Sequence, residues 1–182
     1  MKIVVIGGVA AGTKVAAKLK REHADDEIVI YTKGEHISYA GCGLPYYVGG
    51  TIETEEELVV NTPQKFMGLT RTEVHTGCEV TSVNPKTKTI VVNDGEEKTV
   101  AYDKLVLAVG AEPLVPPLEG VKLPGVFKVR TPEDAVGIRA YAEENACKKA
   151  VVVGGGFIGL EIAENLMAKG IAVTVVDMAP QL

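Results

Sequence analysis

The sequence predicts an α/β protein that contains two β-α-β units with parallel strands. Residues 4–12 and 151–159 each pair a β-branched run with a glycine-rich turn. A segment of helical periodicity follows each turn, and a second β-branched run follows at residues 27–31 and 172–176. This order of elements is typical of a Rossmann-like fold. Because the strands are uniformly apolar, we expect helices to cover both faces of each sheet, which gives three layers.

The other elements follow from periodicity and turn residues. We expect helices at 13–22 and 160–169, short β strands at 74–84, 89–93 and 98–102, and a further buried parallel strand at 104–109. The sequence Asn93-Asp94-Gly95-Glu96 predicts a tight turn between two of the short strands. The middle of the chain is therefore expected to be an antiparallel β-meander inserted after the first β-α-β unit.

A linker is expected after Gly110, where the composition changes. It contains Pro113, Pro116, Pro117 and Pro124 together with Gly120 and Gly125. Residues 131–134, Thr-Pro-Glu-Asp, predict a helix start with an N-cap threonine, a proline at the first helical position and acids in the first turn. The expected division is residues 1–112 for the first domain, 113–145 for the linker and its helix, and 146–182 for the start of the second domain.

Composition excludes several classes of protein. The 182 residues carry a net charge of -5 with both signs interspersed, so a nucleic-acid partner is not expected. The longest apolar runs are shorter than the ~18 residues of a membrane span, and the N-terminal run is too short for a secretory signal. Cys42, Cys78 and Cys147 fit neither a disulfide framework nor a metal site. We expect a soluble cytoplasmic protein without bound metal, in which each cysteine is either buried or reactive.

The second glycine turn carries a complete dinucleotide fingerprint, Gly154-x-Gly156-x-x-Gly159. A strand that ends in glycine and opens a helix directs backbone N–H groups and the helix dipole at a pyrophosphate. Asp177, at the end of the next strand, is the acid expected to accept hydrogen bonds from the ribose of an NAD-type cofactor. The alternative is a glycine turn that serves helix-strand packing alone.

The first glycine turn is an imperfect version of this fingerprint. Gly7 and Gly12 occupy the outer positions, but Val9 replaces the middle glycine. The next strand ends in Tyr31-Thr32-Lys33 rather than in an acid. Taken alone, this loop is equally consistent with a cofactor site and with a structural turn. Together with the second loop, it suggests a flavin and a nicotinamide that work in series.

Cys42 is the candidate reactive thiol. Pro45 suits the first turn of a helix, so Cys42 is expected at or next to a helix N-terminus, where unpaired N–H groups favour a thiolate. A dithiol site would need a second cysteine within a few residues, yet none occurs before Cys78. Chemistry at Cys42 would therefore use one cysteine, through a mixed disulfide, a persulfide or a sulfenate. The alternative is a small buried hydrophobic residue, which is our expectation for Cys78 and Cys147.

Four motifs together resemble the FAD-dependent pyridine nucleotide-disulfide oxidoreductases. They are the first glycine loop, Ser38-x-x-x-Cys42-Gly43-Leu44-Pro45-Tyr46, the run from Tyr102 to Pro113, and the run from Gly154 to Glu161. The resemblance spans the whole chain, and the cysteine motif is its most specific part. The chain is most similar to the single-cysteine branch, which includes coenzyme A disulfide reductases, NADH oxidases and NADH peroxidases.

The resemblance implies an electron relay from NADH or NADPH through FAD to a sulfur species on Cys42. The nicotinamide cofactor would contact Gly154, Gly156, Phe157, Ile158, Gly159 and Asp177. Carried over by position, the FAD contacts would be Gly7, Val9, Ala10, Ala11, Gly12, Thr32, Lys33, Val80 and Gly110. Thr32 stands where many relatives have an acid, so the resemblance does not extend to an acidic ribose contact.

Two features favour a disulfide or persulfide substrate within this branch. Oxidase and peroxidase members carry a histidine in the first glycine loop, and this sequence has Ala10 there. Lys14, Lys18 and Arg21 lie along one face of the first helix. The resemblance implies that they bind the phosphates of coenzyme A, with Ser38 and Gly41 lining the substrate channel. The alternatives are a solvated basic helix face, an NADH oxidase or peroxidase, and a flavin-binding redox sensor without turnover.

The resemblance also implies that the chain is the N-terminal fragment of a longer protein. Relatives add the rest of both cofactor domains and a dimerisation domain, so a homodimer is expected for the full-length protein. We expect residues from about 145 onward to be poorly stable or to pair with another chain, because a single β-α-β unit leaves an unpaired sheet edge.

Overall fold

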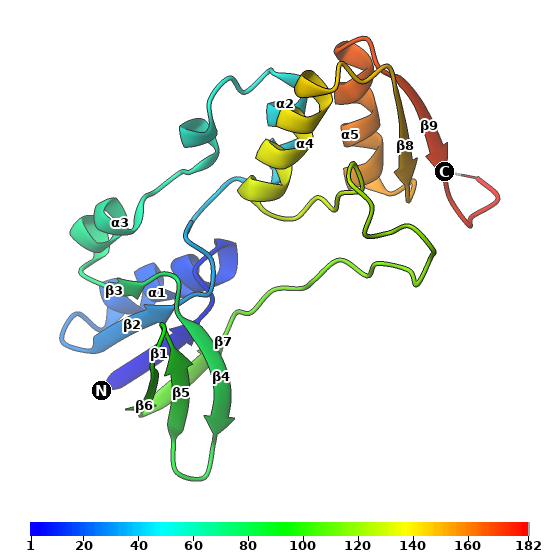
Figure 1. Ribbon diagram of the computed structural model, residues 1–182. Helices are drawn as coiled ribbons and strands as arrows, with labels where there is room; N and C mark the ends of the chain where they lie inside the picture. Colours follow the sequence, from blue (N-terminus) through cyan, green and yellow to red (C-terminus); the bar gives the residue numbers. More distant parts are fainter. Residues whose placement is uncertain (182) are drawn as a thin grey trace. The chain divides into compact units, whose positions relative to one another are not determined.

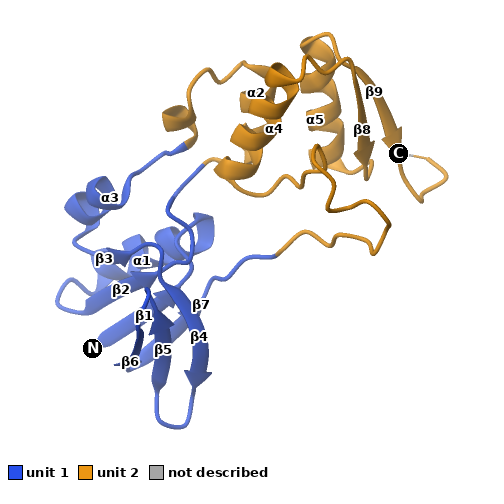
Figure 2. Cartoon of the chain, viewed as in Figure 1, with its two compact units in different colours: residues 1–39, 59–111 blue, residues 40–58, 112–182 orange. Residues whose placement is uncertain are grey.

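The computed structural model describes residues 1–181 and divides into two compact units (Figure 2). Unit 1 comprises residues 1–39 and 59–111, and unit 2 comprises residues 40–58 and 112 onward. The two glycine turns of the sequence repeat therefore fall in different units. The division into cofactor domains at residues 1–112 and 146–182, with a linker at 113–145, remains a prediction.

Unit 1 is built on a four-stranded parallel sheet (Figure 1). Its strands, in spatial order, are β3 (Glu73–His75), β2 (Glu27–Tyr31), β1 (Lys2–Ile6) and β7 (Lys104–Leu107). Helix α1 (Ala10–Glu22) connects β1 to β2, and α3 (Pro63–Thr70) precedes β3. The expected β-α-β unit is confirmed, with Ile3 opposite Ile28 in its parallel register.

A three-stranded antiparallel meander completes unit 1. Its strands, in spatial order, are β4 (Glu79–Asn84), β5 (Thr89–Asn93) and β6 (Glu97–Ala101). The expected turn is confirmed, since Gly95 has φ +110° and donates its N–H to Asn93 Oδ1 at 2.9 Å. The single strand expected at 74–84 is wrong. Gly77, with φ +63°, interrupts it, and the part before Gly77 joins the parallel sheet as β3.

The two faces of the parallel sheet are covered by different structures. One face packs on α1 and α3 in a core of Ile3, Val5, Ala16, Ile28, Ile30 and Phe66. The other packs on the meander in a core of Val4, Ile6, Val29, Tyr31, Ile90 and Val92. The expectation of helices on both faces is therefore wrong for this sheet, because apolar residues of β5 cover the second face. The predicted burial of 104–109 also fails at Leu107, which is 64% exposed.

Unit 2 contains the second β-α-β unit and two further helices. The parallel strands β8 (Lys149–Val153) and β9 (Ala172–Val176) are joined by α5 (Phe157–Ala168), and α4 (Pro132–Glu144) precedes them. The start of α4 is confirmed, because the Thr131 hydroxyl accepts the Asp134 N–H at 3.3 Å. Residues 40–58 form a 3₁₀ turn (Gly41–Gly43), helix α2 (Leu44–Gly49) and a second 3₁₀ turn (Glu55–Leu58).

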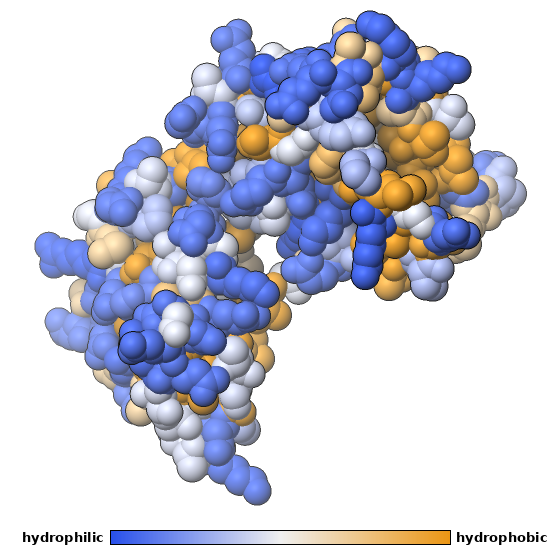
Figure 3. Space-filling view, in the orientation of Figure 1, coloured by the Kyte–Doolittle hydropathy of each residue, from blue (hydrophilic) through white to orange (hydrophobic). Residues whose placement is uncertain are grey.

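One apolar core joins α2, α4, α5, the second 3₁₀ turn and the residue before β9. It consists of Leu44, Val48, Leu58, Ala135, Ile162, Leu166 and Ile171. The opposite face of β8 and β9 carries exposed apolar side chains, with Val151 65% and Val153 68% exposed, and apolar surface gathers over this unit (Figure 3). The expectation of two covered faces is therefore wrong for the part of unit 2 that the structure describes.

The N-terminal amine makes an ion pair that links β1 to the turn before β2. Met1 donates its amine to Asp26 Oδ1 at 2.6 Å. This hydrogen bond raises the pKa of the amine above its ordinary 8.0 and lowers the pKa of Asp26 below its ordinary 3.8. The pair therefore stabilises the folded state fully between these two ordinary values. Its contribution is lost as the pH rises through the raised amine pKa or falls through the lowered Asp26 pKa.

We predict that Asp26→Asn lowers the thermal unfolding temperature by a few degrees near neutral pH, because it leaves the amine without its carboxylate partner. The difference from the wild type should narrow as the pH rises above 8.0 and through the raised amine pKa, because the amine then loses its charge. Differential scanning calorimetry across this range measures both effects, and N-terminal acetylation of the wild type is the matched control. A difference between wild type and variant that does not change with pH would contradict the assignment.

Candidate functional site

The first glycine loop depends on close approach between backbone atoms. Gly7 has φ +107°, and a Cβ there would overlap the carbonyl oxygen of Ala108. A Cβ on Gly12 would overlap the carbonyl oxygen of Gly7. The Gly7 N–H donates to Tyr31 O at 2.8 Å, which fixes the turn at the ends of β1 and β2. The loop therefore needs glycine at both outer positions.

The second glycine loop repeats this geometry. Gly154 also has φ +107°, and its N–H donates to Val176 O at 2.8 Å. A Cβ on Gly159 would overlap the Gly154 carbonyl oxygen, as at the first loop. The middle positions, Val9 and Gly156, have φ of -93° and -73°, which any residue adopts. The middle position of the first loop therefore does not need the positive φ that favours glycine, and a valine can occupy it.

The helices that follow the two loops have uncapped N-termini. Among the helices of eight or more residues within 1–181, α3 and α4 are capped by the side chains of Thr62 and Thr131. In contrast, α1 and α5 have neither a side-chain cap nor an acid in the first turn. The first N–H groups of a helix lack partners within it and attract anions. This difference, together with the glycine cradles, fits a pyrophosphate at each loop.

Side chains at the strand ends distinguish the two loops. Asp177 follows β9, and its Oδ2 accepts the N–H of Gly155 in the second loop at 2.6 Å. Hydrogen bonds from the Ala179 and Gly155 N–H groups lower the pKa of Asp177, so its carboxylate is charged at neutral pH. In unit 1, Thr32 is buried and Lys33 pairs with Glu79 at 2.9 Å.

The remaining positions predicted to contact a cofactor lie at various depths. Val80 is half-buried in β4 against the core of unit 1. Gly110 follows β7, is exposed and has φ +71°. Ala10 and Ala11 are exposed in the first turn of α1. In the first turn of α5, Phe157 is 90% exposed and Ile158 is 59% exposed. Exposure leaves the N-termini of both helices accessible to a ligand.

Cys42 is exposed in the 3₁₀ turn that leads into α2. The expected helix start is confirmed, with Pro45 in the first turn of α2. Gly43 packs closely against Ile52 and Leu58. A Cβ at position 43 would lie 3.0 Å from Ile52 Cδ1 and 3.2 Å from Leu58 Cδ2. Gly41, the preceding predicted site residue, is also exposed.

The other two cysteines are less accessible. Cys78 is buried in the core beneath the meander, and burial raises the pKa of its thiol. Cys147 is half-buried and packs against the core of unit 2. The contrast leaves Cys42 as the exposed thiol of the chain.

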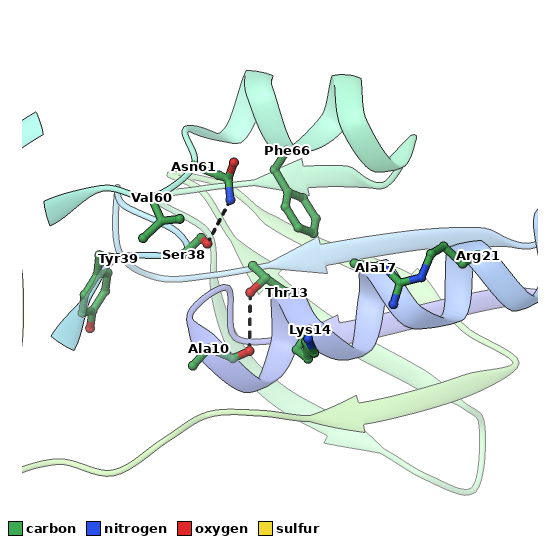
Figure 4. A pocket seen from close by; sticks show the side chains of 10 residues that line it. All are labelled: Ala10, Thr13, Lys14, Ala17, Arg21, Ser38, Tyr39, Val60, Asn61 and Phe66. Atoms are coloured by element: carbon green, nitrogen blue, oxygen red, sulfur yellow. Dashed lines mark hydrogen bonds between the residues drawn. The ribbon is translucent and has the colours of Figure 1, made fainter. Parts of the chain in front are cut away.

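A pocket of about 340 Å³ lies in unit 1 along α1 (Figure 4). Its lining residues are Ala10, Thr13, Lys14, Ala17, Arg21, Ser38, Tyr39, Val60, Asn61 and Phe66. The structure thus brings together three predicted substrate residues, Lys14, Arg21 and Ser38. Lys18 is not part of the lining, and its ammonium instead pairs with Glu22 at 2.6 Å.

Several residues of this pocket were missed by the sequence analysis. Asn61 donates its side-chain amide to Ser38 Oγ at 3.4 Å, and Phe66 of α3 is buried beside the pocket (Figure 4). A backbone hydrogen bond from Val60 N to Ser38 O at 3.1 Å joins the two segments. No local pattern in the sequence indicates this pairing, because the segments are about 20 residues apart. The only available signal is Thr62-Pro63, which predicts the start of α3.

Neither a metal centre nor a membrane span is found in the described residues. Within 1–181, no group of three or more His, Cys, Asp or Glu side chains is arranged to hold a metal ion. In the same part of the chain, no helix has both the length and the apolar character to cross a membrane.

Comparison with known proteins identifies similar chains. A family model described as pyridine nucleotide-disulphide oxidoreductase matches residues 1–182. An NADH oxidase of Methanocaldococcus jannaschii is 44% identical over 100% of this chain and 41% of its own length. A CoA-dependent NAD(P)H sulfur oxidoreductase of Pyrococcus abyssi is 41% identical over 96% of this chain and 39% of its own length.

A solved structure agrees with these relatives. The reduced Bacillus anthracis protein CoADR-RHD is 43% identical and matches with a TM-score of 0.97, covering 100% of this chain and 33% of its own. The chain thus spans about two fifths of the length of the curated relatives it matches.

Alanine substitutions at Gly7 and Gly154 should separate backbone strain from steric overlap. Both residues have φ +107°, but a Cβ on Gly154 meets no described atom within 4 Å, whereas one on Gly7 overlaps the Ala108 carbonyl. We expect Gly154→Ala to cost about 1–3 kcal/mol of unfolding free energy through strain alone. Gly7→Ala should cost at least about 1 kcal/mol more.

Urea unfolding followed by circular dichroism measures both values. Val9→Ala is the control, because position 9 has a negative φ of -93° and already carries a Cβ, so the substitution should change stability little. Equal costs at Gly7 and Gly154 would contradict the overlap with the Ala108 carbonyl.

Proposed function

Since the chain belongs to the pyridine nucleotide-disulphide oxidoreductase family, we propose that the full-length protein is a flavin-dependent NAD(P)H oxidoreductase that acts through Cys42. Its proposed substrate is coenzyme A disulfide, a persulfide or a related low-molecular-weight disulfide. The observation that carries this proposal is the single exposed thiol: Cys42 is exposed, whereas Cys78 is buried and Cys147 is half-buried.

The two glycine loops are proposed as the cofactor sites. FAD would bind in unit 1, with its pyrophosphate at the N-terminus of α1, and NADH or NADPH would bind at the N-terminus of α5. The uncapped helix starts and the cradles formed by Gly7 and Gly154 support this assignment. When bound, the flavin supplies two-electron transfer from the nicotinamide to a sulfur centre. The proposed cofactor domains are residues 1–112 and 146–182, with a linker at 113–145.

Cys42 would act as the nucleophile toward the substrate. Its thiolate attacks one sulfur of a disulfide R–S–S–R′, which forms a Cys42–S–S–R mixed disulfide and releases R′–S⁻. Two electrons, for which NAD(P)H is the source, then cleave the mixed disulfide to the Cys42 thiolate and a second thiolate, R–S⁻. A proton from solvent converts each released thiolate to a thiol. One cysteine suffices because the substrate supplies the other sulfur.

The pocket along α1 is the proposed site for the substrate's nucleotide end. Lys14 and Arg21 are exposed at this pocket, and cationic side chains form charge-assisted hydrogen bonds with phosphates. Ser38 and Asn61 add polar groups to the same wall. The Pyrococcus abyssi relative, which is named for its dependence on CoA, supports a substrate of this class.

The NADH oxidase named among the relatives supports a second reading, in which oxygen is the acceptor. Ala10 stands in the first loop where the sequence resemblance places the histidine of oxidases and peroxidases, so we favour the thiol acceptor. A cytoplasmic location and a homodimer are part of the proposal for the full-length protein.

We predict that Cys42→Ser retains bound flavin and loses disulfide turnover by more than about a thousandfold, because the nucleophile is removed. Absorbance at flavin wavelengths and NADH consumption with coenzyme A disulfide measure the two properties. Cys147→Ser, at a half-buried thiol, is the matched control and should keep turnover. Undiminished turnover in Cys42→Ser would overturn the proposed role, and NADH-dependent oxygen consumption without a thiol acceptor would favour the oxidase.

We predict that Lys14→Gln and Arg21→Gln each raise the KM for coenzyme A disulfide by about tenfold, through loss of a charge-assisted phosphate contact. The KM for cystine, which has no phosphates, should stay unchanged. Lys18→Gln is the matched control, because the Lys18 ammonium pairs with Glu22 outside the pocket lining. Equal KM changes for both substrates would argue against phosphate recognition here.

A further inference from the structure

Arg139 of α4 binds the backbone at the C-terminal end of α2, the helix that follows Cys42. Its Nη1 donates to Tyr47 O at 3.4 Å, to Ile52 O at 3.3 Å and to Glu53 O at 3.1 Å. One guanidinium nitrogen thus joins the last turn of α2 to the segment after it. The guanidinium carbon also lies 4.9 Å from the centre of the Tyr47 ring, in a cation-π contact.

Arg139 also forms an ion pair with Glu143, which in turn pairs with Lys169. Its Nε lies 3.4 Å from Glu143 Oε1, one turn along α4. The same carboxylate oxygen accepts from Lys169 Nζ at 2.6 Å, at the end of α5. The Lys169 ammonium, with a further contribution from Arg139, lowers the pKa of Glu143. The arginine is therefore tied to both long helices of unit 2, and its side chain is only 24% exposed.

Helix α2 needs such support because it is short. It has 6 residues, and a helix of this length does not form by itself in water. Its last carbonyl groups lack partners within the helix, and a cation at a helix C-terminus stabilises it. On another side, Gly49 packs so closely on Asn165 of α5 that a Cβ would overlap the Asn165 side chain. Tertiary contacts therefore determine where α2 lies.

The N-terminal end of α2 is continuous with the turn that carries Cys42. Gly43 N donates to Ala40 O at 2.8 Å, and Ala40 N donates to Leu58 O at 2.8 Å, which closes the segment at its base. A displacement of Tyr47 therefore moves a helix whose first residue directly follows the turn that carries Cys42. Attack on a sulfur requires alignment, and a displacement of about 1 Å can cost up to about a hundredfold in rate.

We propose that Arg139 is a positioning residue for Cys42, which holds α2 and thereby the thiol in the orientation for attack on the substrate. The reaction in this proposal rests on the proposed function, whereas the positioning does not. The contacts of Arg139 are to Tyr47, Ile52, Glu53 and Glu143, which lie outside both glycine loops.

The test uses the flavin-loaded full-length protein, together with an electron acceptor that the flavin reduces without Cys42. In Arg139→Met, which keeps the aliphatic volume without the donors, we expect kcat for disulfide reduction to fall by about 10- to 100-fold. The KM for the disulfide should change by less than about threefold. NADH-dependent ferricyanide reduction, which needs flavin but not Cys42, should stay at the wild-type rate.

Two further variants and one physical measurement sharpen the result. Arg139→Lys, which retains the charge and a donor, should recover part of the lost kcat. Glu143→Gln, which spares the three backbone contacts of Arg139 but removes its charged partner, should lower kcat by less than Arg139→Met does. Amide hydrogen exchange should become faster in residues 44–53 of Arg139→Met, while α5 stays protected.

Four outcomes would overturn the proposal. The first is a disulfide kcat within about twofold of wild type in Arg139→Met. The second is a parallel loss of ferricyanide reduction, and the third is unchanged amide exchange in residues 44–53. The fourth is failure of both Arg139→Met and Arg139→Lys to fold, which would indicate a general structural role. If the wild type reduces no disulfide, the proposed function fails separately. The rate of Cys42 alkylation by iodoacetamide then tests positioning, and equal rates in wild type and Arg139→Met would contradict it.

Discussion

Contact between backbone atoms at the first glycine loop sets the geometry on which unit 1 depends. Gly7 lies against the Ala108 carbonyl at the end of β7, and Gly12 lies against the Gly7 carbonyl. These contacts hold β1, β7 and the start of α1 closer than any side chain would permit. They also place the uncapped N-terminus of α1 just beyond the carboxyl end of β1, so the constraint that shapes the sheet also forms the proposed phosphate site.

Unit 2 uses the same constraint and adds a segment from elsewhere in the chain. Residues 40–58 pack on α4 and α5, although more than 70 residues separate them from the start of α4. Leu44, Val48 and Leu58 supply their share of the core, and Arg139 supplies the polar contacts. The exposed thiol is consequently carried by the unit that also contains the second glycine loop.

Local patterns predicted the fold where the information was local. The bounds of β2 and β9, the Thr131 cap and the turn at Gly95 all agree with the sequence, because each depends on neighbouring residues. Burial was predicted less well, since an apolar strand does not reveal what covers it: the meander covers one face of the first sheet, and Val151 is exposed. Contacts between distant segments, such as those of Asn61 and Arg139, leave no periodic signal.

In the second glycine loop, the N–H of Gly155 already donates a hydrogen bond to the carboxylate of Asp177. A ligand that requires this N–H has to displace a charged carboxylate, so its net affinity is the difference between two sets of hydrogen bonds. A small anion only replaces the carboxylate as the acceptor of this N–H, so its net binding free energy is small. A larger ligand that also gives the released carboxylate new donors gains from both exchanges. In the proposed function the acid would thus act as an internal competitor, which would make the loop selective for ligands with both an anionic group and hydroxyl groups.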